Sequence, residues 1–146
     1  MAVIRIFLAY AAAVVVTLLL ASAFHTQMVI KALIDVGAVV SLERRLGMTG
    51  TDLIGLAPQF GLVIAIGLAI GFLAAAILKR FLKPLAPVAY PIAGAAAIAV
   101  ALTAMSMAFD GITPIAGARS AFGFGLQCFA GAIGGAVFAL IAVRTK

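Results

Sequence analysis

Four long stretches of the chain are apolar and contain no Asp, Glu, Lys or Arg. They lie in the intervals Arg5–Lys31, Asp52–Lys79, Lys83–Asp110 and Arg119–Arg144. Each stretch exceeds the about 20 apolar residues that a helix needs to cross the hydrocarbon core of a bilayer. Strict alternation of apolar and polar residues, the pattern of a membrane β-strand, is absent, and residues 11–21 are apolar on every helical face. The pattern predicts membrane-spanning helices.

Proline, glycine and polar residues at the ends of these stretches shorten the predicted helices to about 6–24, 58–78, 85–109 and 121–143. We therefore expect an all-α membrane protein, a four-transmembrane-helix bundle that forms a single integral membrane domain over residues 1–146. A tight inner turn at 79–84 joins the second and third helices. Residues 110–120 contain Gly, Thr-Pro and a second Gly, and they predict an outer loop between the third and fourth helices.

The connection between the first and second helices, residues 25–57, is too long for a structureless loop. At 100° per residue, the polar side chains of 27–35 fall on one stripe and the apolar side chains on the opposite stripe, as in an interfacial amphipathic helix. Ser41 and Thr51 can each cap a further short helix. The sequence thus predicts an outer lid of short helices, which is either a gate for a substrate or a passive cover.

Composition excludes a soluble globule. The 146 residues are 66% hydrophobic and 10% charged, with a mean hydropathy of +1.33, whereas soluble domains are roughly 45–50% apolar and 25% charged. The net charge is +6, from ten Lys and Arg against four Asp and Glu. In a soluble protein such a charge would suggest nucleic acid as a partner, but here the positions of the charges matter more than their sum.

Four spans place both termini on one side of the membrane. The inner segments then hold six basic residues and no acid, and the outer segments hold the other four basic residues and all four acids. The positive-inside rule therefore predicts a cell (inner) membrane protein with both termini in the cytoplasm. Anionic lipid headgroups suffice as partners of the basic face, without nucleic acid. The six inner residues are Arg5, Lys79, Arg80, Lys83, Arg144 and Lys146.

The first apolar stretch has an alternative interpretation as a signal peptide. Met1–Arg5 is short and positive, Ile6–Leu20 is apolar, and Ala21-Ser22-Ala23 fits the small-x-small pattern of a cleavage site. Cleavage after Ala23 would leave three spans in the same orientation. The apolar stretch lies at the long limit for a signal peptide, which favours four spans.

Two glycine pairs predict close helix packing. Gly67 and Gly71 are four residues apart in the second helix, and Gly131 and Gly135 are four residues apart in the fourth. Small residues at this spacing let helix backbones approach, which matters in lipid because apolar burial drives helix association only weakly there. Both helices run inward, so the two faces can pack together, or they can form a homodimer or contact another membrane protein.

Candidate chemistry within the predicted spans is sparse. None of them carries an ionisable residue in its interior, which disfavours a proton-coupled antiporter of the small multidrug type and an ion pump. A single cysteine, Cys128, excludes an intramolecular disulfide and a thiol relay. The single histidine, His25, has too few neighbouring ligands for a zinc site. We expect no catalytic residue, no metal and no cofactor.

The remaining polar groups gather toward the outer side of the predicted bundle. We expect them either to converge beneath the lid into a polar-rimmed apolar pocket, or to serve packing alone, with Asp110 and Arg119 as a loop-closing ion pair and Gln127 as an interhelical hydrogen bond. The candidate ligand-binding residues are His25, Asp52, Gln59, Asp110, Arg119 and Gln127.

Three functional hypotheses follow from these features. The leading one is a non-enzymatic accessory or assembly subunit that packs through its glycine-rich helices on another membrane protein or on itself. The second is a carrier or binder of a lipid, quinone or other apolar molecule that enters from the outer leaflet. The third, a lipid-modifying enzyme, requires His25, Asp52, Asp110 and Arg119 within hydrogen-bond reach of one another, and we rank it last.

Overall fold

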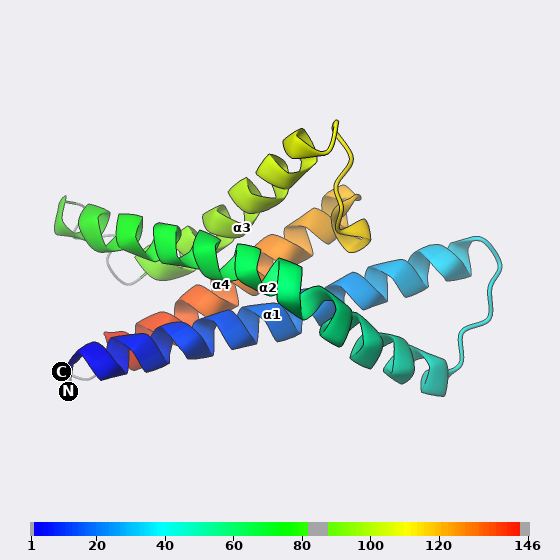
Figure 1. Cartoon of the computed structure of the whole chain (residues 1–146), viewed down its shortest axis with the longest axis horizontal. Helices are drawn as coiled ribbons and strands as arrows, with labels where there is room; N and C mark the ends of the chain where they lie inside the picture. Colours follow the sequence, from blue (N-terminus) through cyan, green and yellow to red (C-terminus); the bar gives the residue numbers. More distant parts are fainter. Residues whose placement is uncertain (1, 82–87, 144–146) are drawn as a thin grey trace.

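The computed structural model describes residues 2–81 and 88–143, and within these ranges the chain is helical without any strand. The described residues form four long helices, whose arrangement Figure 1 shows. Each is long and apolar enough to cross a membrane, so the all-α, four-helix part of the predicted fold class is confirmed. The elements are α1 (Ala2–Asp35), α2 (Leu42–Phe81), α3 (Ala89–Ala108), the short 3-10 helix η2 (Ala116–Ala118) and α4 (Ala121–Ala142).

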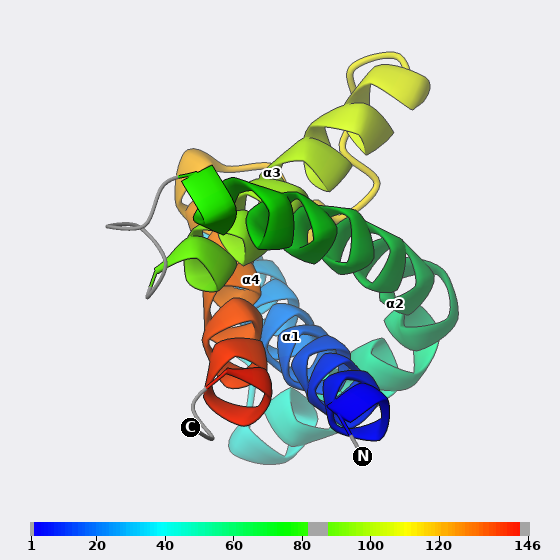
Figure 2. The same cartoon turned by 90° about the vertical axis from the view of Figure 1, so that its left-hand side faces the viewer.

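The helices alternate in direction and form a ring. Helix α1 begins and α4 ends at one end of the bundle, which we call the termini end, and residues 36–41 and 109–120 lie at the other, the hairpin end (Figure 1). Helix α4 packs on α1 and α3, and α2 packs on the same two helices from the other side, whereas the diagonal pairs make little contact. Figure 2, which faces the termini end, shows α4 lying between α1 and α3.

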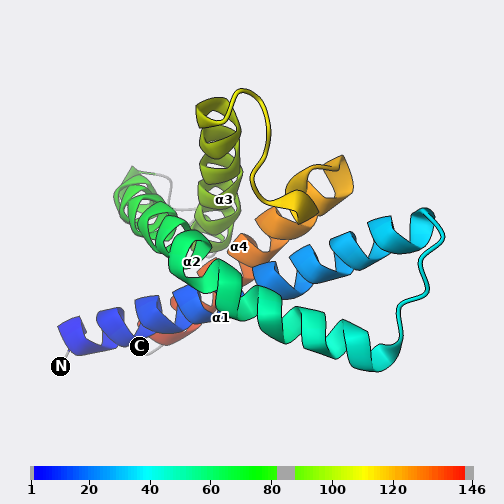
Figure 3. The same ribbon diagram turned by 45° about the vertical axis from the view of Figure 1, so that its right-hand side comes forward.

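The expected outer lid of separate short helices is wrong. Residues 25–35 are the last turns of α1, residues 42–57 are the first turns of α2, and only 36–41 connect them. Figures 1 and 3 show these turns diverging before the connector joins them. At a rise of 1.5 Å per residue, the 34 residues of α1 and the 40 of α2 measure about 51 and 60 Å, well beyond the about 30 Å of a hydrocarbon core.

Local chemistry explains where the two long helices end and begin. Gly37 adopts a φ of 90°, a left-handed conformation that terminates α1, and its N–H donates to the Ile34 carbonyl at 2.9 Å. Ser41 caps α2 as expected, because its Oγ accepts a hydrogen bond from the Arg44 N–H at 3.4 Å. Thr51 instead sits inside α2 and donates to the Gly47 carbonyl at 3.0 Å, so the third predicted helix start is wrong.

The second and third predicted helices also shift at their ends. Pro58, the expected start of the second helix, lies inside α2. Residues 79–81 belong to its last turn rather than to the expected inner turn, of which 82–84 lie outside the described residues. The third helix begins at Ala89 instead of 85, with 85–87 outside the described residues, and ends at Ala108. The fourth, α4, matches its prediction within a residue.

The glycines of α4 provide the closest helix contacts. A Cβ atom on Gly131 would overlap the Gly94 carbonyl of α3, one on Gly135 would overlap the Tyr90 carbonyl, and one on Gly134 would overlap the Thr17 hydroxyl of α1. Backbone therefore meets backbone along α3 and α4, which only glycine allows. The Gly131–Gly135 pair is used inside the chain.

The glycines of α2 contact the same helix less closely. A Cβ on Gly71 would lie 3.0 Å from the Ala93 carbonyl oxygen, and one on Gly67 would lie 3.6 Å from the Ala97 carbonyl oxygen. Helix α3 thus lies between the two glycine pairs, which do not pack against each other as the sequence had allowed.

Candidate functional site

Polar side chains gather on one face of α1 toward the hairpin end. The imidazole Nδ1 of His25 accepts a hydrogen bond from the Gly117 N–H at 3.1 Å. A Cβ on Gly117 would lie 2.6 Å from the His25 Cα, so the loop around η2 rests directly on α1. His25 is 9% exposed and holds this loop in place, which is a structural role.

Asp52 reaches the same turn of α1 from α2. The Thr26 hydroxyl, fully buried, donates to Asp52 Oδ2 at 2.8 Å and also lies 3.1 Å from the Ser22 carbonyl oxygen. A carboxylate bonded to a buried hydroxyl links the two helices at this level, since charge-assisted hydrogen bonds are stronger than neutral ones. Asp52 therefore contacts α1 at the residue that follows His25.

Gln127 lies deeper, in the interface of α1 and α4. Its side chain is completely buried, and Nε2 donates to the Ala21 carbonyl at 3.0 Å. In the described part of the chain, Gln127 Oε1 has no hydrogen-bond partner, and the same holds for Ser22 Oγ and Thr17 Oγ1. The amide ties α4 to α1 one turn below His25.

The other three candidates do not join this cluster. Gln59 is exposed on α2, and Asp110 is exposed with a φ of 53°, a left-handed conformation that aspartate tolerates. Arg119 Nε donates to the Thr113 carbonyl at 3.1 Å. Within residues 2–81 and 88–143 the ion pair is Lys31–Asp35, so the expected pair of Asp110 and Arg119 is not formed.

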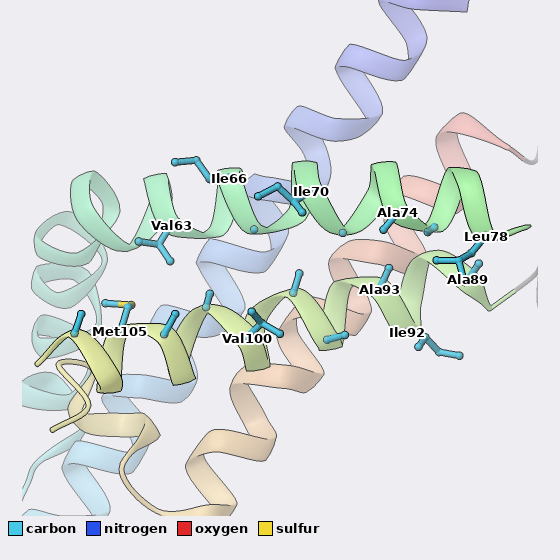
Figure 4. A pocket seen from close by; sticks show the side chains of 18 of the residues that line it. Val63, Ile66, Ile70, Ala74, Leu78, Ala89, Ile92, Ala93, Val100 and Met105 are labelled. Carbon is cyan, nitrogen blue, oxygen red and sulfur yellow. The ribbon is translucent and has the colours of Figure 1, made fainter. Parts of the chain in front are cut away.

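The structure instead reveals a long groove between α2 and α3, which we call the α2–α3 groove (Figure 4). It has a volume of about 730 Å³ and runs from Val63 to Lys79 on α2 and from Ala89 on α3 to Phe109, the residue that follows α3. Lys79 contributes the polar side chain of the lining, and more than half of the lining residues are Gly or Ala. At 1.5 Å per residue the groove extends about 24 Å along α2 and 30 Å along α3.

A second groove of about 550 Å³ lies near the termini end between α1, α2 and α4. We call it the basic groove, because Lys79 and Arg80 line it beside apolar and aromatic side chains. The rings of Phe72, Tyr90 and Phe138 contact one another there, with centroids 4.5 to 5.7 Å apart.

Sequence reasoning missed both grooves, although part of the signal was present. Gly67 and Gly71 belong to the α2–α3 groove, but their spacing indicated a closed contact. The alanines of the third helix recur every three or four residues opposite them. This row of small residues is the sequence pattern that corresponds to the groove.

No family model, curated protein or solved structure matches this chain. The fold alone defines an all-α protein with four helices suited to crossing a membrane. Any function is therefore inferred from the geometry of the described residues.

Proposed function

We propose that this protein is a multi-pass inner-membrane protein with cytoplasmic termini that acts as an accessory or assembly subunit. Its α2–α3 groove receives a transmembrane helix of another membrane protein. The orientation is supported by the charges, because Arg5, Lys79 and Arg80 lie at the termini end and all four acids lie in segments of the hairpin end.

The observation that carries the proposal is the length and lining of the α2–α3 groove. It extends about 30 Å along α3, the full thickness of a hydrocarbon core. Small residues from both helices form its walls, and small residues let a third backbone approach closely enough for van der Waals packing. A transmembrane helix matches this length, whereas a lipid chain covers only one leaflet.

The groove favours a different protein over a second copy. A two-fold dimer places the same surface of each chain opposite itself. Two concave faces leave a gap between them, but a single convex helix fills the groove. The partner is therefore a helix with a ridge of small or branched apolar residues.

In-membrane photocrosslinking tests this proposal. A photoreactive residue at Ala96, which is exposed and lines the groove, should give one adduct of defined mass with another membrane protein. The same residue at Gly125, where a Cβ would meet open space on α4, is the matched control. Adding Ala74→Leu, which fills the groove from α2, should abolish the adduct.

Two results would contradict the proposal. Equal adducts from positions 96 and 125 would indicate random collisions in the membrane. An adduct of twice the chain mass would indicate a homodimer.

The alternative function, a carrier of an apolar molecule from the outer leaflet, receives less support. That hypothesis placed its pocket beside Gln127 beneath a lid. Gln127 lines neither groove, and its amide Nε2 is bonded to α1. The segment expected as a lid is part of α1 and α2. The geometry therefore favours the accessory subunit.

A further inference from the structure

We infer that the basic groove is a binding site for one anionic phospholipid of the leaflet at the termini end, with its phosphate at Lys79 and Arg80. This site shares Lys79 with the α2–α3 groove but has its other lining residues to itself, and it does not depend on the proposed helix partner. It also goes beyond a general attraction of basic residues to the membrane surface, because it requires a hollow of defined shape beside the charges.

Lys79 is held at this groove by Tyr90. Its ammonium donates to the Tyr90 hydroxyl at 2.8 Å and lies 5.0 Å from the centre of the same ring. Tyr90 is 5% exposed, so the lysine is fixed against the bundle instead of extending freely toward water. An ammonium has three N–H donors, and one of them is used by the phenol.

The charged side chains named at the basic groove are all positive. Arg80 is exposed beside Lys79 and lines the groove, and Arg5 Nη2 donates to the carbonyl of Ala142, which also lines it. All four side-chain carboxylates belong to segments at the hairpin end, namely Asp35, Glu43, Asp52 and Asp110. Basic hollows between helices at the cytoplasmic side of a membrane fit anionic headgroups.

The depth of the groove matches a lipid better than a helix. Its α2 lining extends from Arg80 to Ala69, about 16 Å at 1.5 Å per residue. This is about half of the 30 Å hydrocarbon core, which is the depth of one leaflet. Ile6, Leu73 and Ala76 provide apolar walls below the two cations, so an acyl chain can lie along them while the phosphate stays at the rim.

Native mass spectrometry of the purified full-length protein, with added phosphatidylglycerol or phosphatidylcholine of identical chains, tests the site. The wild type should retain one phosphatidylglycerol in preference to phosphatidylcholine. The double variant Lys79→Gln/Arg80→Gln should lower the affinity for phosphatidylglycerol about 30-fold, from about fivefold per cation. The matched control Arg44→Gln/Arg45→Gln removes two adjacent cations at the hairpin end and should change nothing.

Two further variants keep the test decisive. Arg80→Gln alone alters an exposed side chain, leaves the Lys79–Tyr90 bond intact, and should lower the affinity about fivefold. Ala76→Phe keeps both cations but fills the groove, and it should also weaken phosphatidylglycerol binding. Equal retention of both lipids by the wild type would overturn the site, as would equal losses in the two double variants or unchanged binding in Ala76→Phe.

Discussion

A glycine-to-alanine series tests the packing of the bundle most directly. The four positions differ in the space that an added methyl group would find. Gly125 faces open space, Gly67 has its nearest neighbour at 3.6 Å, Gly71 has the Ala93 carbonyl oxygen at 3.0 Å, and Gly135 would overlap the Tyr90 carbonyl. The substitution is the same at each site, so differences among the variants report the helix contacts alone.

The expected change is the sum of two opposing effects. Alanine in a helix is more favourable than glycine by up to about 1 kcal/mol. Overpacking against backbone costs about 1–3 kcal/mol. Gly125→Ala and Gly67→Ala should therefore raise stability slightly, and Gly71→Ala should leave it nearly unchanged. Gly135→Ala should lower it by about 2 kcal/mol, because neither Tyr90 nor α4 can move its backbone cheaply.

Thermal stability in mild detergent provides the assay. The chain lacks tryptophan, so a fluorescent-protein fusion followed by size-exclusion chromatography after heating is a suitable readout. With about 2–4 °C per kcal/mol for a chain of this size, Gly125→Ala and Gly135→Ala should differ by about 6–12 °C. Equal midpoints for these two variants would refute the backbone contact between α3 and α4.

Two smaller predictions concern the polar face of α1. His25→Ala leaves the buried Gly117 N–H without its acceptor and should lower stability by about 1–3 kcal/mol, measured as a drop in the same thermal midpoint; an unchanged midpoint would show that the loop is held by other contacts. Gln127→Leu removes one interhelical hydrogen bond worth about 0.6 kcal/mol together with a buried carbonyl that lacks a partner, so its midpoint should stay within about 3 °C of wild type. A much larger loss would mean that Gln127 Oε1 bonds a molecule other than the described chain.

The number and location of the helices were predictable, because an uncharged stretch of 20 or more residues in a chain this apolar indicates a membrane-spanning helix. Helix ends were less predictable. Thr51 and Asp52 have the chemistry of a helix start, but the preceding residues are already helical from Leu42 onward. A helix continues where each added residue gains a hydrogen bond. Only Gly37, with its left-handed backbone, stopped α1.

The grooves were not predictable, because they depend on which residues face each other across two helices. The glycine pairs of α2 and α4 have the same spacing in the sequence. Gly131 meets another glycine, Gly94, and the backbones touch. Gly67 meets Ala97, whose methyl group keeps the helices further apart, and this separation leaves an open groove beside the contact. The residues that a glycine pair faces, rather than its spacing in the sequence, therefore decide whether two helices touch along their backbones or leave a groove.

The backbone contact between α3 and α4 also determines how the sequence can drift during evolution. At Gly94, Gly131 and Gly135 every other amino acid adds atoms where a carbonyl already lies. The first turns of α1, by contrast, have exposed apolar side chains at Val3, Ile4 and Phe7, where many apolar residues are equivalent. A comprehensive substitution library should therefore retain almost no variants at the three glycines and accept most apolar exchanges at the start of α1.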